Sequence, residues 1–403
     1  MTDDELIARV REWLAANWDA QAKKGRNVAS ALEWRRTVHA AGFSVPSWPE
    51  SFGGLGLTPE QSKLVEREFK RVGAPGAGID RANIPANTVF QYGTDRVKAE
   101  LLDKFVTEEI GMCLLYSEPG AGSDLAGVRT RADLQGDHYL INGQKVWTSG
   151  AMSADYGLLL CRTDWDVPKH SGLSFMLCPM KQDGIEIRPI HQINGESHFN
   201  EVFIDNAKVP VHNLLAGEGQ GWKVMQTALA YERLIMGEGA IERDAGGSAN
   251  EIGGKAPDAG RDLVEFARRH GRLGDPVMRQ QIAQAVAWRR LNTLNGARAK
   301  AAAAAGEASP LMSMGKLAVS RVLHEDARVR REILGAMGLI DGPECQDAKD
   351  MNFRSLHAYM NSIGGGTDQI QRNIIGERVL GLPREVEVDR NIPFRESLGA
   401  RAG

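Results

Sequence analysis

The sequence has no apolar run that approaches the ~20 residues needed to cross a lipid bilayer. Its first residues, Met1-Thr2-Asp3-Asp4-Glu5, are acidic and show none of the basic and then apolar character of a secretory signal peptide. Blocks of basic residues are also missing, and 49 Lys+Arg against 52 Asp+Glu give a net charge of -3. We therefore expect a cytoplasmic protein that binds neither a membrane nor nucleic acid through its charge.

Cysteine is scarce, and the motifs of several enzyme classes are absent. The four cysteines form no C-x-x-C pair and are predicted to be reduced thiols of the core. The G-x-x-x-x-G-K-S/T phosphate loop, the H-E-x-x-H zinc motif and a G-x-G-x-x-G after a strand do not occur. The nine histidines are scattered without the spacing of metal ligands. The sequence thus argues against P-loop NTPases, zincins and a nicotinamide-binding Rossmann domain, and we expect no metal site.

The composition that remains is typical of a globular protein, with 42% hydrophobic and 25% charged residues in a chain of 403 residues, enough for two or three domains. Residues 1–112, where turns separate helical patterns, are predicted to form an N-terminal helical domain. Residues 113–216 contain short apolar strings bounded by Gly, Pro, Asp and Asn, which predict a central β domain. Residues 217–403 return to long Ala-, Leu- and Arg-rich segments and are predicted to be helical. Within the β domain, Asn142-Gly143 predicts a type I′ hairpin between two strands.

Two short motifs of the β domain contain residue types that suit a phosphate or a flavin. The first is the segment from Tyr116 to Asp124, Y-S-E-P-G-A-G-S-D, in which small residues and hydroxyls let backbone N–H groups approach an anion. A Gly-rich surface turn has the same composition. The second is Trp147-Thr148-Ser149-Gly150, which places an aromatic ring beside two hydroxyls. An isolated tryptophan in such a strand is more often part of core packing than a cofactor platform.

The order of these motifs along the chain resembles the acyl-CoA dehydrogenase family. S-E-P-G-A-G-S-D and I-N-G-x-K-x-W are followed by Glu201-Val202-Phe203-Ile204-Asp205, by I-L-G-A-M-G from Ile333 to Gly338, and by G-T-D-Q-I-Q-R from Gly366 to Arg372. The resemblance covers nearly the whole chain, and several ordered motifs are more specific than one glycine loop. It implies an α+β fold with an N-terminal helical domain, a central β-barrel domain and a C-terminal four-helix-bundle domain.

The resemblance also implies a chemistry, the oxidation of an acyl-CoA to its 2,3-enoyl-CoA by FAD, with electron-transfer flavoprotein or a similar acceptor as the electron partner. Ser117 and Ser149 would hydrogen-bond the flavin ring near its pyrimidine edge and N5, and Trp147 would pack on the isoalloxazine. Thr367 and Gln369 would touch the dinucleotide. The other implied cofactor contacts are Tyr116, Gly122, Ser123 and Gly335, the last of them typically from a neighbouring subunit. The implied substrate contacts are Ser123, Arg233 and Gly365.

Removal of the proton α to the thioester requires a carboxylate within hydrogen-bond reach of the α carbon. The best-known family position for this glutamate lies just before G-T and is occupied here by Gly365. A predicted helix offers a replacement, because Glu232 falls on an apolar stripe with 3, 4, 3, 4 spacing formed by Trp222, Met225, Leu229, Glu232 and Met236. Isovaleryl-type members of the family carry their glutamate on this helix, which implies that Glu232 is the base, with its pKa raised by burial. The alternative is a buried ion pair of Glu232 with Arg233 or a distant arginine.

Two other functions stay open at this point. Gly365 could mark a non-catalytic or half-active partner subunit of a mixed acyl-CoA dehydrogenase tetramer. The same fold also serves flavin oxidases and hydroxylases that act on substrates other than CoA esters, such as nitroalkanes. In either case we expect a homotetramer or a mixed tetramer, because the family's last helical domain packs against its copies. The glycines at 364–366 favour branched, cyclic or steroid-like acyl groups, since they carry no bulky side chain.

Overall fold

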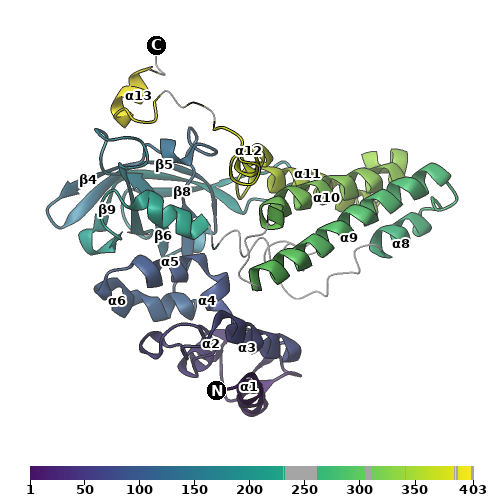
Figure 1. Cartoon of the computed structure of the whole chain (residues 1–403), viewed down its shortest axis with the longest axis horizontal. Coiled ribbons are helices and arrows are strands. Elements are labelled where there is room, and N and C mark those ends of the chain that lie inside the picture. Colours follow the sequence, from purple (N-terminus) through teal and green to yellow (C-terminus); the bar gives the residue numbers. More distant parts are fainter. Residues whose placement is uncertain are drawn as a thin grey trace. The chain divides into compact units, whose positions relative to one another are not determined.

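The computed structural model (Figure 1) describes residues 1–229, 231, 261–304, 310–340, 342–384, 386 and 389–400. The chain divides into two compact units, which are described separately. Unit 1 comprises Met1–His191, Ser197–Glu232 and Glu387–Gly403, and unit 2 comprises Gln192–Glu196 and Arg233–Val386. Helices precede and follow a mixed sheet, so the predicted α+β class is confirmed.

Two of the helices in the N-terminal part of unit 1 begin at capping boxes. Its elements are α1 (Asp3–Asn17), β1 (Trp18–Asp19), β2 (Lys24–Gly25), α2 (Ala31–Ala40), η1 (Glu50–Phe52), α3 (Pro59–Val72), α4 (Ile79–Ala82), α5 (Ile84–Tyr92) and α6 (Asp95–Val106). Thr2 and Glu5 form a capping box at α1, and Thr58 and Gln61 form another at α3, so each helix starts where its first N–H groups find side-chain acceptors. The inward faces of α1, α2 and α3 share one apolar cluster, which includes Leu6, Val38 and Phe69.

The sheet of unit 1 has eight strands. They are β3 (Met112–Leu115), β4 (Arg131–Gln135), β5 (His138–Ser149), β6 (Tyr156–Arg162), β7 (Leu173–Pro179), β8 (Ile185–Ile190), β9 (Phe199–Pro210) and β10 (Leu214–Leu215), with the short turns η2 (Leu125–Gly127), η3 (Ala151–Ser153) and η4 (Val211–Asn213) between them. The strand order is β10-β7-β6-β4-β5-β9-β8, and β3 pairs with β6 in parallel. The chain therefore leaves β3 beside the centre of the sheet, where the first motif begins.

Strands β6 and β7 are buried on both faces, which explains their continuous apolar sequences. Leu158 and Leu160 share a cluster with Phe105 of α6, and Figure 1 shows α5 and α6 lying next to the sheet. Leu159 and Cys161 share the opposite cluster with residues of β5 and β9. The domain that carries the two motifs is thus packed on both sides of its central strands.

The cysteine prediction is confirmed for the three cysteines of the sheet. Cys113, Cys161 and Cys178 are buried and free, and Cys345 is free and half-buried. Burial raises the pKa of Cys113 to about 12 and that of Cys161 to about 12, so both stay protonated at neutral pH.

The predicted hairpin at Asn142-Gly143 is wrong. Strand β5 runs through both residues, and the two-residue turn lies earlier, where Gln135 pairs with His138 around Gly136 at φ +65°. Gly143 serves close packing instead, because a Cβ at this position would lie 2.5 Å from Thr130 Oγ1 and 2.8 Å from Thr130 Cα. An Asn-Gly pair and a glycine at a close approach look alike in sequence, and the tertiary contact decides between them.

Unit 2 is helical in its described part. It contains α8 (Arg261–Arg269), α9 (Pro276–Ala304), α10 (Pro310–Leu334), η5 (Gly335–Leu339), α11 (Gln346–Ile363) and α12 (Asp368–Arg378). An apolar cluster from α8 to α11 includes Leu263, Ile282 and Val329. Asp326 lies in this interior and pairs with Arg289 and Arg330, all three side chains being buried. Among the helices that the structure describes, none is long and apolar enough to cross a membrane.

Candidate active site

The Gly-rich loop (residues 116–124) follows β3 and carries the first motif. Glu118 and Ala121 exchange two backbone hydrogen bonds of 3.0 Å, so Pro119-Gly120 forms a tight turn. A Cβ added at Gly120 or at Gly122 would meet no protein atom within 4 Å, and neither residue has a positive φ. The chain's own packing does not require these glycines. Open backbone of this kind is what a bound molecule needs for close approach.

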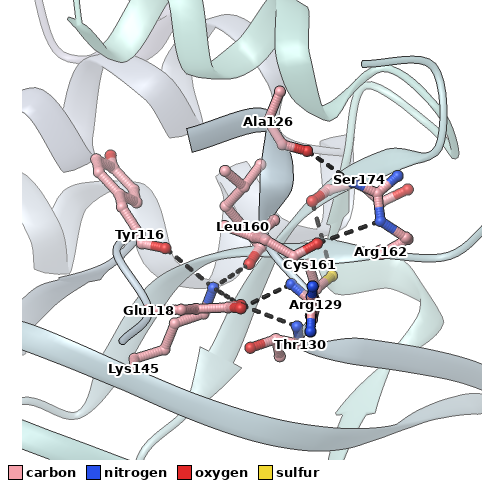
Figure 2. A network of polar contacts seen from close by, with 11 residues as sticks. Tyr116, Glu118, Ala126, Arg129, Thr130, Lys145, Leu160, Cys161, Arg162 and Ser174 are labelled. Carbon is pink, nitrogen blue, oxygen red and sulfur yellow. Dashed lines mark hydrogen bonds and ion pairs between the residues drawn. The ribbon is translucent and has the colours of Figure 1, made fainter. Parts of the chain in front are cut away.

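A buried ion pair fixes the Gly-rich loop to β5 (Figure 2). The ammonium group of Lys145 donates to the carboxylate of Glu118 at 2.9 Å, to the carbonyl of Tyr116 at 3.0 Å and to the carbonyl of Leu160 at 2.7 Å. Lys145 is fully buried, and its three donors are all used. The Glu118 carboxylate also accepts the backbone N–H groups of Arg129 at 2.7 Å and Thr130 at 2.8 Å. One charge pair therefore fastens the loop, β5, β6 and the entry to β4.

This arrangement makes Glu118 a structural carboxylate. Burial by itself would raise the pKa of Glu118, but the charge of Lys145 and the hydrogen bonds of Lys145, Thr130 and Arg129 together hold that pKa below its ordinary value. Burial lowers the pKa of Lys145, while the adjacent carboxylate favours the charged ammonium. A carboxylate held ionised by three donors is a poor proton acceptor, so Glu118 braces the loop and is unsuited to be the base.

The second motif lies beside the first, at an irregularity of β5. The N–H of Val146 donates to the carbonyl of Ser117 at 3.0 Å, and the pairing of β5 with β9 shifts between Lys145 and Thr148. At this bulge Trp147 adopts φ +62°, a left-handed conformation that is strained for a bulky residue. Trp147 is 58% exposed, and its ring lies 5.9 Å from that of Phe199 in an edge-to-face arrangement. An exposed tryptophan in strained backbone indicates a functional position.

The residues of the two motifs are of types that suit a flavin. The indole of Trp147 is a flat apolar ring in an exposed residue, and Ser149 and Ser123 of the same two motifs are exposed as well. Ser117 is half-buried next to Val146, and Gly122 offers uncovered backbone. Tyr116 differs from the others, because its ring packs on Phe175 at 5.6 Å and its carbonyl takes part in the polar network. A planar ring with polar edges suits an aromatic platform flanked by hydrogen-bond donors.

The predicted site residues of unit 2 fall at two separate places. Thr367 is the N-cap of α12, where its hydroxyl accepts the N–H of Ile370 at 3.2 Å, and Gln369, two residues later, is exposed. Asp368 binds Ser320 of α10 at 2.8 Å, which places the start of α12 against that part of α10. Gly335 follows the end of α10, fifteen residues and about 22 Å further along the helix at ~1.5 Å per residue. Gly335 and Thr367 of one chain are therefore not neighbours.

Of the two candidate positions for the catalytic carboxylate, the structure describes 365 but not 232. Gly365 lies between α11 and α12 with φ +65°, so a glutamate at this position would be strained. Residues 221–229 are helical, and the first three positions of the predicted stripe, Trp222, Met225 and Leu229, pack in the cluster that includes Phe105. Glu232, Arg233 and Met236 lie outside the described residues. The inward direction of the stripe is thus seen in its first turns.

Two residues of the site region have no predicted role in the sequence analysis. Lys145 is the buried cation of the polar network, and the alternation of β5 could have indicated it, because Tyr139, Ile141 and Lys145 all fall on alternate positions of the strand and are buried. Arg162 ends the apolar strand β6 and is fully buried, which no local pattern suggests for an arginine.

The chain matches family models over three consecutive stretches. Residues 2–109 match the acyl-CoA dehydrogenase N-terminal domain, residues 113–207 the acyl-CoA dehydrogenase middle domain, and residues 219–380 the acyl-CoA dehydrogenase C-terminal domain. Among curated proteins it is similar to acyl-CoA dehydrogenase IpdE1 of Mycobacterium tuberculosis, with 34% identity over 408 residues, 95% of this chain and 99% of the relative. The IpdE1 protein of Mycolicibacterium smegmatis is 35% identical over 410 residues, 95% of this chain and 98% of the relative.

Solved structures are similar over the same length. The Tcur3481-Tcur3483 steroid ACAD has a TM-score of 0.70 and 28% identity, over 95% of this chain and 98% of that chain. The ChsE4-ChsE5 complex from Mycobacterium tuberculosis has a TM-score of 0.67 and 28% identity, over 95% and 98%. A glutaryl-CoA dehydrogenase of Mycobacterium smegmatis in complex with FADH2 shares the fold, with a TM-score of 0.62 and 19% identity over 95% and 96%.

Proposed function

This chain belongs to the acyl-CoA dehydrogenase family, and we propose that it oxidises the α,β bond of an acyl-CoA thioester to the 2,3-enoyl-CoA with FAD as cofactor. The single observation that carries the proposal is the bulge of β5, where strained and exposed Trp147 is joined to the Gly-rich loop through Val146 and Ser117. Bound in this region, FAD would supply the acceptor for the hydride that leaves the β carbon.

The residues of this chain have distinct tasks in that reaction. Trp147 would pack on the isoalloxazine, and Ser117 and Ser149 would hold it by hydrogen bonds that favour the electron-rich reduced ring. Ser123, at the exposed end of the Gly-rich loop, faces the thioester or CoA side of the substrate. Thr367 and Gln369 contact the dinucleotide, and Gly335 does so from a neighbouring subunit.

We propose Glu232 as the base that takes the α proton. Support comes from the inward packing of Trp222, Met225 and Leu229, which share its stripe, and from the glycine at position 365, where the usual family carboxylate is missing. Glu118 cannot serve as the base, because this buried carboxylate is held ionised by Lys145. Burial beside the acyl chain and the flavin would raise the pKa of Glu232 toward the working pH.

A mixed tetramer is the assembly that we propose. The ChsE4-ChsE5 and Tcur3481-Tcur3483 structures each join two differently named chains, and unit 2 of this chain carries large apolar side chains in exposed positions, among them Leu339, Tyr359, Ile363 and Leu380. Surfaces of that kind mark protein interfaces. Because the Tcur3481-Tcur3483 relative is a steroid ACAD, and residues 364–366 carry no side chains, we also propose a bulky polycyclic acyl group as the substrate class.

The test is an anaerobic titration of the purified protein, alone and co-expressed with a second dehydrogenase subunit, with a panel of acyl-CoA esters. We expect a yellow protein that releases FAD on denaturation, loses flavin absorbance with a preferred ester, and yields the matching 2,3-enoyl-CoA by mass spectrometry. A folded protein that neither holds nor takes up FAD would overturn the proposal. Flavin reduction only in the co-expressed complex, unaffected by replacement of Glu232, would instead assign this chain as the non-catalytic partner.

A further inference from the structure

The C-terminal segment of the chain returns to unit 1. After the helices of unit 2, α13 (Phe394–Ala400) belongs again to the unit that carries the Gly-rich loop. The backbone N–H of Phe394 donates to the carbonyl of Val167 at 2.9 Å, and that of Arg395 donates to the carbonyl of Trp165 at 2.9 Å. Phe394 is only 3% exposed, and its ring lies 5.6 Å from that of Trp165. The segment is therefore docked by both backbone and side chain.

The ring of Phe394 covers a buried arginine. The guanidinium carbon of Arg162 lies 3.5 Å from the centre of the Phe394 ring, and the Arg162 side chain is fully buried. Arg162 donates to three carbonyls, those of Ala126 at 2.7 Å, Val128 at 3.2 Å and Lys169 at 3.0 Å. In the part of the chain that the structure describes, no carboxylate pairs with it directly, and burial lowers the pKa of Arg162 to about 10. Its charge is stabilised by carbonyl dipoles and by an aromatic face.

These carbonyls belong to the backbone that anchors the Gly-rich loop. Ala126 and Val128 lie two and four residues after Asp124, and Figure 2 shows Arg162 bound to the carbonyl of Ala126. Lys169, whose carbonyl accepts from Arg162, pairs through its ammonium group with Asp124 at 3.2 Å. Arg162 thus joins the end of the Gly-rich loop to the segment from Trp165 to Lys169, on which the C-terminal segment is docked.

We propose that Phe394 and Arg162 are positioning residues for acyl-CoA binding: Phe394 shields the guanidinium from water, and Arg162 in turn holds the backbone that sets the place of Ser123. The kinetic part of this inference rests on the proposed function, in which Ser123 faces the thioester or CoA. Without the ring, water competes for the guanidinium, and its hydrogen bonds to Ala126 and Val128 weaken because solvent offers other acceptors. The end of the Gly-rich loop then becomes more mobile, while the ion pair of Glu118 and Lys145 still holds its beginning.

The test compares the full-length, FAD-loaded protein with Phe394→Ala and with Arg395→Ala. Arg395→Ala is the control, because it removes an exposed ion pair with Asp166 at 2.9 Å from the same segment and leaves the Phe394 ring over Arg162. We expect Phe394→Ala to increase amide hydrogen exchange at residues 122–128 and to raise KM for the acyl-CoA about tenfold, with kcat changed by less than about twofold. Arg395→Ala should change neither the amide exchange at residues 122–128 nor the KM. Phe394→Tyr keeps an aromatic face, so its exchange and KM should be those of the unmodified protein.

Unchanged exchange at residues 122–128 in Phe394→Ala overturns the inference, and so does increased exchange with an unchanged KM. If Phe394→Ala does not fold, Phe394→Leu keeps most of the apolar volume, removes the ring and carries the same expectations. An equal fall of kcat and stability without a change in KM would assign Phe394 to packing alone. Because exchange does not depend on turnover, a protein that oxidises no acyl-CoA would defeat the proposed function and leave the exchange result to decide the role of Phe394.

Discussion

Lys145 and Glu118 form an ion pair of 2.9 Å in which the lysine side chain is fully buried and the glutamate side chain is 8% exposed. The two residues lie on different elements, β5 and the Gly-rich loop. Their charges are therefore removed from water only when the two motifs of the site come together. The pair therefore holds the Gly-rich loop in place once the sheet has folded.

Breaking this pair should be costly. Lys145→Met leaves the Glu118 carboxylate buried without its counter-charge, and we expect a loss of about 3–5 kcal/mol in the free energy of unfolding of unit 1. The double variant Glu118→Gln with Lys145→Met should lose clearly less, because no charge remains unpaired. Urea unfolding of the apoprotein, followed by tryptophan fluorescence, measures both. Equal losses for the single and the double variant would contradict the account.

Trp147→Gly should separate stability from cofactor binding. Glycine relieves the left-handed strain at φ +62° and should leave the stability of the apoprotein unchanged or about 1 kcal/mol higher, while FAD affinity falls at least about tenfold, because the aromatic platform is lost. Lys23→Gly, at φ 51° in the β1–β2 turn, is the matched control and should leave FAD affinity unchanged. Equilibrium FAD binding to the two apoproteins decides the matter, and full affinity in Trp147→Gly would remove Trp147 from the site.

Two glycine-to-alanine changes should have opposite consequences. A Cβ at Gly122 meets no protein atom within 4 Å, so Gly122→Ala should keep the stability of the apoprotein and weaken FAD or acyl-CoA binding about tenfold. At Gly143 the same Cβ would lie 2.5 Å from Thr130 Oγ1, and Gly143→Ala should destabilise the apoprotein by about 1–3 kcal/mol. Thermal unfolding and ligand titration of both variants test this pair. A Gly122→Ala protein that binds both ligands normally would show that the glycine serves neither.

Glu232→Gln should abolish proton abstraction and keep the cofactor. The amide cannot accept the α proton, so flavin reduction by the preferred acyl-CoA should slow by about 10²–10⁴-fold with FAD still bound. Glu265→Gln, which removes an exposed glutamate of α8, is the control and should reduce flavin normally. Rapid-mixing measurements under anaerobic conditions give both rates. An unchanged rate in Glu232→Gln would exclude it as the base.

The helical part of unit 1 should show an acid-sensitive ion pair. Hydrogen bonds from Arg11, and then from Arg71, outweigh burial and lower the pKa of Glu68 from 4.5 to about 2. Because the folded-state pKa is the lower one, this stabilisation is complete above pH 4.5 and is lost as the pH falls toward 2. Glu68→Gln should therefore cost about 1–2 kcal/mol at pH 6, a modest value since solvent screens the half-exposed arginines. The difference from the unmodified protein should shrink between pH 4.5 and pH 2. A difference that is independent of pH would contradict the assignment.

Local pattern was sufficient for the class of the fold and for the identity of the two motifs. Apolar runs bounded by Gly and Pro predicted the sheet strands, since a strand buried on both faces must be apolar throughout, as β6 and β7 are. The order of the motifs led to the acyl-CoA dehydrogenase family, which the family models confirm. The periodicity of the helix that begins near Trp222 predicted its inward face, and Met225 is fully buried there.

The tertiary structure alone decided how the site is held. Asn142-Gly143 has the composition of a turn, yet the approach of Thr130 keeps it inside a strand. The left-handed backbone of Trp147 arises from the pairing of β5 with β9, and the burial of Arg162 depends on a ring more than two hundred residues later in the chain. Bulges, close approaches and shielded charges depend on which segments meet across the fold. The composition of each segment can be seen in the sequence, but the packing of the fold determines which segments come into contact.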